Sequence, residues 1–168
     1  MIKVGITGSK GFVGYHLYQT LALQKDEFSL IEFDRSFFDD NQTLDAFVSS
    51  CDVIVHLAAL NRHNDPQFIY ETNTLLVKSL VASLKRTASK AHLIISSSTQ
   101  EERDNLYGKS KKEGRLLLSE WANQIGGSLS GLVIPNVFGP FGHPNYNSVI
   151  ATFCHQIARS ETPKIDVD

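Results

Sequence analysis

The feature that most constrains this chain is a set of three glycines directly after its first apolar segment. Gly8, Gly11 and Gly14 follow the apolar residues 2–7, and helical spacing begins at Phe12. In a strand–turn–helix unit, the first glycine permits a sharp turn and the second lets a pyrophosphate approach the backbone amides. The third lets the helix pack closely on the strand. The helix N-terminus adds free N–H groups and partial positive charge. The pattern predicts a dinucleotide-binding turn; the alternative is a tight turn without a ligand.

Strand-like and helix-like segments alternate along the rest of the chain. Apolar runs predict strands over residues 2–7, 28–33, 52–57, 92–96 and 129–134, and helical spacing predicts helices over residues 12–23, 44–48, 66–86, 106–124 and 147–159. Continuously apolar strands suit a parallel sheet covered on both faces, so the fold class is α/β, with a doubly wound, Rossmann-type sheet. Only 17 residues separate Asp34 from Asp52. We therefore expect a vestigial strand around Phe37 and Phe38.

Composition limits the kinds of partner. A length of 168 residues predicts one domain over residues 1–168, and the net charge of −2 argues against nucleic acid or an anionic membrane as the main partner. No signal peptide and no run of 18 apolar residues is visible, so no membrane contact is expected. Cys51 and Cys154 lie far apart, and the six histidines show no ligand spacing. These patterns predict no metal site and a cytoplasmic location.

Tyr107 and Lys111 are candidates for catalysis. They lie four residues apart in a predicted helix and share one face, and the preceding strand leads into Ser96, Ser97 and Ser98. A carbonyl that accepts hydride develops negative charge, which a positioned acid must neutralise. The ordinary pKa of tyrosine is too high for easy ionisation, and a neighbouring ammonium lowers it. We expect Lys111 to lower the pKa of Tyr107. The alternative makes the serines strand-end caps and Tyr107 a packing residue.

Together these segments resemble the extended short-chain dehydrogenase/reductase family, which includes nucleotide-sugar epimerases, dehydratases and reductases. The resemblance places the catalytic hydroxyl on Ser98, beside Tyr107 and Lys111. It implies cofactor contacts from Gly8, Lys10, Gly11, Phe12, Val13, Gly14, Asp34, Arg35, Leu57, Ala58, Ala59, Asn73, Tyr107, Lys111 and Pro135. It implies substrate contacts from Asn61, Arg62, Ser98, Thr99, Asn136 and Asn147. For Asn136 and Asn147, turn and helix-cap roles are the alternative.

The choice of cofactor depends on three charged residues. Asp34 and Arg35 stand at the end of the second predicted strand, and Lys10 lies in the glycine turn. A carboxylate here favours NAD through the ribose 2′-hydroxyl, whereas cations favour the 2′-phosphate of NADP. Two cations outweigh one carboxylate, which favours NADPH. In the alternative, Lys10 and Arg35 are solvated surface charges and Asp34 selects NADH or NAD.

Other positions refine the resemblance. Asn73 matches an asparagine that braces the active-site backbone in this family; the alternative is an ordinary exposed helix residue. Thr99 and Gln100 stand where the family's sugar dehydratases carry carboxylates, so dehydration is disfavoured, although Glu101 is one residue on. The basic run of Lys109, Lys111, Lys112 and Arg115 is expected to be a solvated helix face.

A narrower resemblance involves the N-terminal reductase half of bifunctional capsular-polysaccharide enzymes. It rests mainly on residues 144–154 and 157–159. That group reduces the 4-keto group of a UDP-2-acetamido-2,6-dideoxy-hexulose with NADPH, so the resemblance implies a UDP-sugar substrate. A C4 epimerase with retained NAD and a non-catalytic dinucleotide-binding module are the alternatives.

The same relatives are longer and carry a C-terminal substrate lobe and a zinc-dependent cupin. We therefore expect residues 1–168 to be part of a longer enzyme, with another strand beginning at residues 163–168. Relatives often dimerise through the two long helices, here residues 66–86 and 106–124, which implies a possible homodimer.

Overall fold

The computed structural model describes residues 1–163 and 165. The chain divides into two compact units, Met1–Val133 and Ile134–Asp168. The strand expected at residues 163–168 falls almost entirely outside the described residues. Within the described part of the chain, no helix combines the length and apolarity needed to cross a bilayer.

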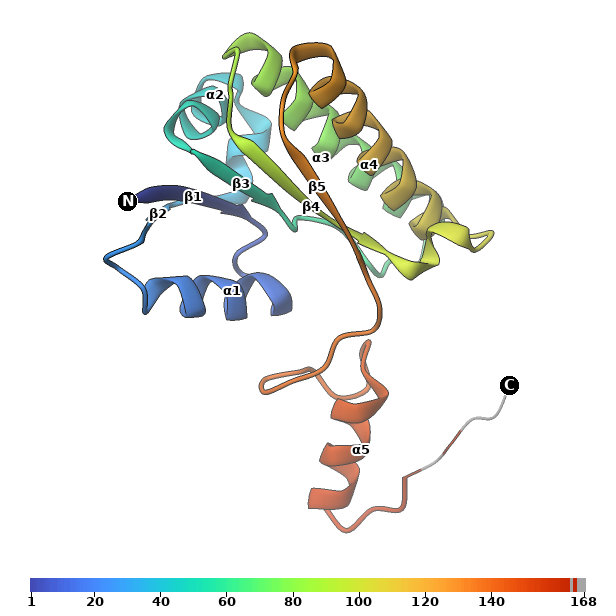
Figure 1. Ribbon diagram of the computed structural model, residues 1–168. Helices are drawn as coiled ribbons and strands as arrows, with labels where there is room; N and C mark the ends of the chain where they lie inside the picture. Colours follow the sequence, from blue (N-terminus) through green and yellow to red (C-terminus); the bar gives the residue numbers. More distant parts are fainter. Residues whose placement is uncertain (164, 166–168) are drawn as a thin grey trace. The chain divides into compact units, whose positions relative to one another are not determined.

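A five-stranded sheet organises the first unit (Figure 1). Its order is β2-β1-β3-β4-β5, with β1 (Ile2–Thr7), β2 (Phe28–Ile31), β3 (Val53–His56), β4 (His92–Ser98) and β5 (Leu129–Ile134). β1 pairs in parallel with β2 and β3, and β3 pairs in parallel with β4. The α/β class with a Rossmann-type sheet is therefore confirmed. β4 extends two residues further than predicted, so all three serines belong to the strand.

Helices cover both faces of this sheet. Figure 1 shows α1 (Phe12–Ala22) on one face, and α2 (Asn41–Ser50), α3 (Pro66–Arg86) and α4 (Leu106–Ile125) on the other. α1 places Leu17 and Leu21 against Val4 and Ile6 of β1. α4 ends where Gly126 adopts a left-handed backbone with φ +64°, a conformation that glycine adopts without steric cost.

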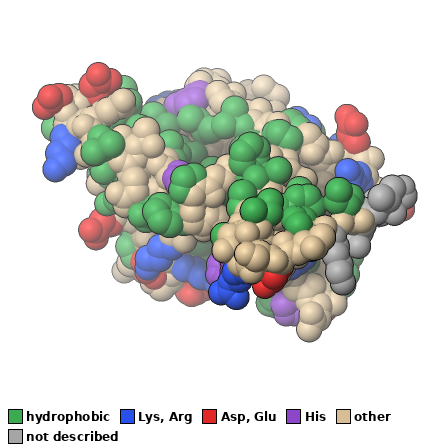
Figure 2. Space-filling model, turned by 90° about the horizontal axis from the view of Figure 1, so that it is seen from below, with side chains coloured by type: hydrophobic (Ala, Val, Ile, Leu, Met, Phe, Trp, Pro, Cys, Tyr) green, Lys and Arg blue, Asp and Glu red, His purple; other side chains and the backbone are tan. Residues whose placement is uncertain are grey.

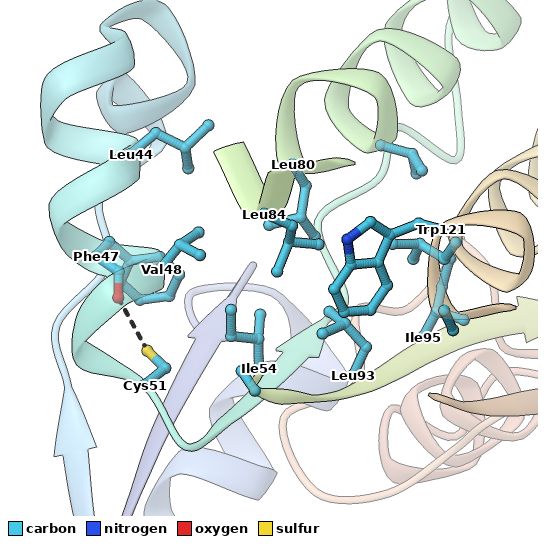
Figure 3. Close-up of a cluster of buried hydrophobic side chains, with 14 residues drawn as sticks. Leu44, Phe47, Val48, Cys51, Ile54, Leu80, Leu84, Leu93, Ile95 and Trp121 are labelled. Carbon is cyan, nitrogen blue, oxygen red and sulfur yellow. Dashed lines mark hydrogen bonds between the residues drawn. The ribbon is translucent and has the colours of Figure 1, made fainter. Parts of the chain in front are cut away.

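The larger hydrophobic core lies between the sheet and α2, α3 and α4 (Figure 3). Trp121 of α4 packs there with Leu80 and Leu84 of α3 and Leu93 of β4, and all four are at most 1% exposed. Burying such side chains stabilises the fold by about 1.5–3 kcal/mol each. The core therefore fixes α3 and α4 against β4, the part of the sheet that carries the serines.

The expected vestigial strand at Phe37 and Phe38 is wrong. These residues lie in a short 3-10 helix, η1 (Arg35–Asp39), which begins where Asp34 Oδ1 accepts a hydrogen bond from Ser36 N at 3.1 Å. The Phe33 ring meets the rings of Phe37 and Phe38 edge-on, with centroids 5.4 and 5.2 Å apart. The apolar pair therefore packs into an aromatic cluster beside the core and does not pair with a strand.

The described residues of the second unit include the helix α5 (Val149–Ala158), which begins after Ser148. Ser148 Oγ caps it by accepting a hydrogen bond from Ala151 N at 3.2 Å, so the helix is shorter than predicted. Large apolar side chains of this unit are exposed, among them Phe138, Phe141 and Ile157. Hydrophobic side chains are also visible on the face of the molecule drawn in Figure 2.

Candidate active site

The glycine turn is too crowded for side chains. Gly8 has a left-handed backbone with φ +79°, and a Cβ there would lie 2.7 Å from Ala58 N. A Cβ on Gly14 would collide with the carbonyl oxygen of Gly8. Gly11 lies at the cap position directly before α1 and has no side chain, so the first amides of the helix are not bonded by a capping side chain. This cradle, which a Cβ would fill, fits the pyrophosphate of a dinucleotide.

An ion pair links the glycine turn to the end of β2. Lys10 Nζ lies 3.1 Å from Asp34 Oδ2, and both side chains are at least half exposed. Asp34 also accepts hydrogen bonds from the backbone N–H and the hydroxyl of Ser36. The Ser36 backbone first, and then Lys10, lower the pKa of Asp34 to about 2. The carboxylate is therefore ionised and already engaged, with exposed Arg35 next to it.

Tyr107 and Lys111 lie in the first two turns of α4. Lys111 is 9% exposed, and its Nζ donates a hydrogen bond to the carbonyl oxygen of Ser96 at 3.0 Å. Burial lowers the pKa of Lys111 to about 8, although the nearby charge of Glu101 opposes this effect. The ammonium lies 6.0 Å from the centre of the Tyr107 ring.

The expected lowering of the Tyr107 pKa is not found. Burial raises the pKa of this phenol above its ordinary value. The Lys111 ammonium is bonded to the backbone of β4, and the Tyr107 hydroxyl has lost part of its contact with water. Desolvation disfavours the charged phenolate, so Tyr107 is a protonated phenol at neutral pH.

Ser98 ends β4 and starts the next turn. Its side chain is buried, and its Oγ accepts a hydrogen bond from Gln100 N at 3.2 Å, which caps the 3-10 helix η2 (Thr99–Glu102). The strand-end cap weighed in the sequence analysis is therefore present. Because the hydroxyl accepts in this contact, its own proton remains for donation. Thr99, the next residue, is exposed.

Close packing fixes η2 against the start of α4. A Cβ on Gly108 would collide with the carbonyl oxygen of Gln100. Asn105 caps α4 by accepting a hydrogen bond from Gly108 N at 2.7 Å, and its amide donates to Gln100 Oε1 at 3.3 Å. The serine turn and Tyr107 are therefore held as one local assembly.

Asn73 of α3 is buried, which excludes the exposed-residue alternative. Its Oδ1 accepts from Leu60 N at 2.6 Å, and its Nδ2 donates to Leu60 O at 2.9 Å and to Ser110 Oγ at 3.0 Å. Asn73 therefore ties the segment after β3 to α3 and α4. Leu57, Ala58 and Ala59 in that segment are half-buried, and Asn61 and Arg62 are exposed.

Two further buried residues lie at this edge: Thr7, which no sequence pattern predicted, and His56, which begins the segment that the resemblance matches to the family's cofactor lining. Thr7 Oγ1 lies 2.8 Å from His56 Nδ1, and it also accepts from Ala58 N at 3.3 Å. Burial, together with the charge of Lys111, lowers the pKa of His56 to about 3, so the ring is neutral. A small cavity beside this pair is lined by His56, Ala58, Ala59, Asn73, Val77, Ile95, Ser110, Lys111 and Gly114. The signal in the sequence was a polar residue at the end of each of two neighbouring apolar strands.

Glu101 and Arg115 form a second polar pair. Arg115 Nε and Nη2 donate to the two carboxylate oxygens of Glu101 at 2.9 and 2.6 Å, and Ser97 Oγ also donates to Glu101. Arg115 first, and Ser97 further, lower the pKa of Glu101, so its carboxylate is a poor base. This fits the expectation that dehydration is disfavoured. The basic run is not one solvated face, because Lys111 is buried and Arg115 is paired, whereas Lys109 and Lys112 are exposed.

The remaining predicted positions lie in the second unit. Pro135, Asn136 and Asn147 are exposed there. Their contacts with cofactor or substrate stay predictions. Within residues 1–163 and 165, no group of three or more histidine, cysteine, aspartate or glutamate side chains could hold a metal ion.

Comparison with known proteins finds relatives that are similar to this chain in sequence and in structure. A UDP-2-acetamido-2,6-beta-L-arabino-hexul-4-ose reductase of Pseudomonas aeruginosa is 37% identical over 158 residues, which is 94% of this chain and 42% of the relative. The crystal structure of the capsular polysaccharide assembling protein CapF from Staphylococcus aureus is similar with a TM-score of 0.77 and 36% identity, over 99% of this chain and 43% of that protein.

A third similarity concerns the fold alone. RMD from Pseudomonas aeruginosa, solved with NADPH, has a TM-score of 0.83 at 24% identity, over 95% of this chain and 61% of that protein. The chain thus spans about two fifths of the length of the first two relatives. A family model described as the NAD dependent epimerase/dehydratase family matches residues 4–167. With the glycine turn, the sheet order and this match over nearly the whole chain in agreement, the chain belongs to the NAD dependent epimerase/dehydratase family.

Proposed function

We propose that this chain is the dinucleotide-binding part of a nucleotide-sugar 4-ketoreductase. The substrate is the C4 ketone of a UDP-linked 2-acetamido-2,6-dideoxy sugar, the reductant is NADPH, and the product serves capsule or O-antigen polysaccharide synthesis. The observation that carries this proposal is the position of Tyr107 and buried Lys111 on α4 beside the serine end of β4, in the same unit as the glycine cradle. The 37% identical reductase supports the sugar class.

Each residue has a defined task in this reaction. The bound dinucleotide would supply the hydride. Tyr107 donates its phenolic proton to the C4 oxygen as negative charge develops there, and the Ser98 hydroxyl donates a hydrogen bond to the same oxygen. Lys111 supplies the positive charge that stabilises the resulting phenolate. The amides at the start of α1 bind the pyrophosphate.

The charges near the end of β2 support NADPH. Asp34 is already engaged by Ser36 and Lys10, so it is a poorer acceptor for a ribose 2′-hydroxyl. Arg35 adds a second cation beside this pair. A 2′-phosphate would compete for Lys10 and bring two negative charges towards both cations.

Titration with NADPH and NADH separately, followed by the fluorescence of the reduced nicotinamide, tests the cofactor assignment. Tighter binding of NADPH supports the reductase, and tighter binding of NADH shifts the assignment to an NAD-retaining epimerase. NADPH oxidation with a UDP-4-keto-2,6-dideoxy sugar then tests turnover. Binding without turnover on any such sugar, in a parent enzyme that includes the substrate lobe, would identify a dinucleotide-binding module.

A further inference from the structure

The Arg115–Glu101 ion pair is unusually well enclosed for a pair near a turn. The Glu101 side chain is 8% exposed and that of Arg115 is 33% exposed. Two N–H···O contacts join them, one to each carboxylate oxygen, and Ser97 of β4 donates a third hydrogen bond to the carboxylate. A pair with this two-point geometry is held more firmly than an ordinary surface pair.

The surrounding elements leave room for this pair. Tyr107, Lys111 and Arg115 are spaced four residues apart, so they form one stripe along α4. β5 has Gly131 where the Arg115 stem passes, and a Cβ there would lie 2.9 Å from Arg115 Cδ. The stripe therefore carries a proton donor, a buried ammonium and an arginine that holds a carboxylate on the facing turn.

The Arg115–Glu101 pair also affects the pKa of Lys111, through the charges that surround this lysine. The titratable groups near it are His56 of β3, Glu101 of η2 and Tyr107 of α4 itself; α3 contributes neutral Asn73 to the cavity beside it. His56 is neutral and Tyr107 is protonated. Lys111 Nζ donates to Ser96 O, and Ser97, the next residue of β4, donates to Glu101, so the ammonium and the carboxylate are held at neighbouring positions of one strand. Among these groups Glu101 carries the negative charge, which opposes the effect of burial on the pKa of Lys111.

We propose that the Arg115–Glu101 pair is a positioning device for Tyr107 and Lys111: it fixes η2 against α4 and holds an ionised carboxylate next to the strand residue that binds the buried Lys111 ammonium. Arg115 keeps Glu101 ionised and in one orientation, and Ser97 ties the same carboxylate to β4. The benefit for catalysis rests on the proposed function, because a charged Lys111 matters there for stabilising the phenolate. The electrostatic relationship itself does not depend on turnover.

The test is the pKa of Lys111 measured by NMR in protein labelled with ¹³C at lysine Cε. The Lys111 signal is identified by its loss in Lys111→Arg. In Glu101→Gln the pKa of Lys111 should fall by about half a unit or more, because the negative charge of the Glu101 carboxylate is removed. Glu101→Asp, which keeps the charge, should retain most of the parent value.

Asp104→Asn is the matched control. It removes a carboxylate from the segment between η2 and α4, but the Asp104 side chain is 91% exposed and forms an ion pair with Lys109. The Lys111 pKa should not change in this variant. An unchanged Lys111 pKa in folded Glu101→Gln, or an equal fall in both variants, would overturn the proposal.

Arg115→Met carries the same test with the opposite sign. Removing a positive charge and leaving the Glu101 charge less compensated should raise the pKa of Lys111, and a fall would contradict the proposal. This variant also serves if Glu101→Gln does not fold, which circular dichroism will show. Failure to bind NADPH would count against the proposed function and would leave these NMR results interpretable.

Discussion

The Lys111 ammonium donates its shortest described hydrogen bond to the backbone carbonyl of Ser96, at 3.0 Å. The lysine of the proposed reaction is thus fixed to the strand that carries the serines. The contact also holds the positive charge of Lys111 in a buried position, where only 9% of the residue is exposed. Burial fixes the position of the Lys111 ammonium but lowers the stability of the fold, because burial disfavours the charged form.

Replacing Lys111 by Met should stabilise the fold at neutral pH. Burial lowers the pKa of Lys111 from 10.5 to about 8. The cost of burying the charge is therefore fully present below pH 8 and disappears as the pH rises from 8 to 10.5. We expect Lys111→Met to raise the free energy of unfolding by about 1–3 kcal/mol at pH 7. Urea unfolding at several pH values measures this, and a stability gain that does not shrink above pH 8 would contradict it.

Tyr107→Phe should keep dinucleotide binding and lose turnover. The substitution removes one hydroxyl and little volume, so the effect falls on proton donation, with an expected loss of about 10²–10⁴ in turnover. The measurement is NADPH oxidation with the keto sugar by an active, full-length parent enzyme. Tyr70→Phe removes a hydroxyl that bonds Glu113 on the outer part of α3 and α4, and it should leave turnover within about twofold of the parent. Equal losses in both variants would refute the role of Tyr107.

Lys10→Ala should weaken NADPH more than NADH. Lys10 is 85% exposed and reaches Asp34 across the end of β2, where a 2′-phosphate would bind. Losing one charge-assisted contact should weaken NADPH binding by about tenfold and change NADH binding little. Lys109→Ala, at an exposed lysine of α4, is the control for a general loss of positive charge. The dissociation constants of NADPH and NADH, measured for each variant, test this prediction.

Gly14→Ala should destabilise the first unit and abolish dinucleotide binding. The added Cβ collides with the carbonyl oxygen of Gly8, which is backbone and moves only with the whole turn. We expect a loss of about 2–4 kcal/mol in the free energy of unfolding. At Gly126 a Cβ meets nothing within 4 Å, and only the φ of +64° disfavours alanine, so Gly126→Ala should cost about 1–2 kcal/mol. Urea unfolding of both variants makes the comparison.

The outer faces of α3 and α4 are expected to form a homodimer contact. Phe68 and Leu75 of α3 and Leu116 of α4 are between 48% and 63% exposed. Leu75→Glu should shift the chain to a monomer, because a charge buried in an apolar contact is costly. Light scattering after size exclusion measures the mass. Leu23→Glu, at an exposed leucine after α1, should leave the mass unchanged. A monomeric parent chain would rule out the contact.

The sequence by itself determined the features that depend on local pattern. The strand–turn–helix spacing of Gly8 and Gly14 specified the cradle, because only a residue without Cβ fits at either position. The alternation of apolar runs with segments of helical spacing specified the order of strands and helices. The helix α3 was predicted with its observed bounds, Pro66–Arg86. Spacing of four residues on a helix placed Tyr107 and Lys111 on one face. Each of these signals involves residues close together in the chain.

The tertiary structure alone decided which polar groups are buried, which are paired and how they titrate. Phe37 and Phe38 lie in a 3-10 helix because Phe33 and Phe47 offer an aromatic surface. Arg115 is paired because folding brings Glu101 onto α4 from 14 residues away. The pKa of Tyr107 is raised because folding buries its phenol. Desolvation and pairing depend on neighbours that are distant in sequence, and local pattern carries no information about them.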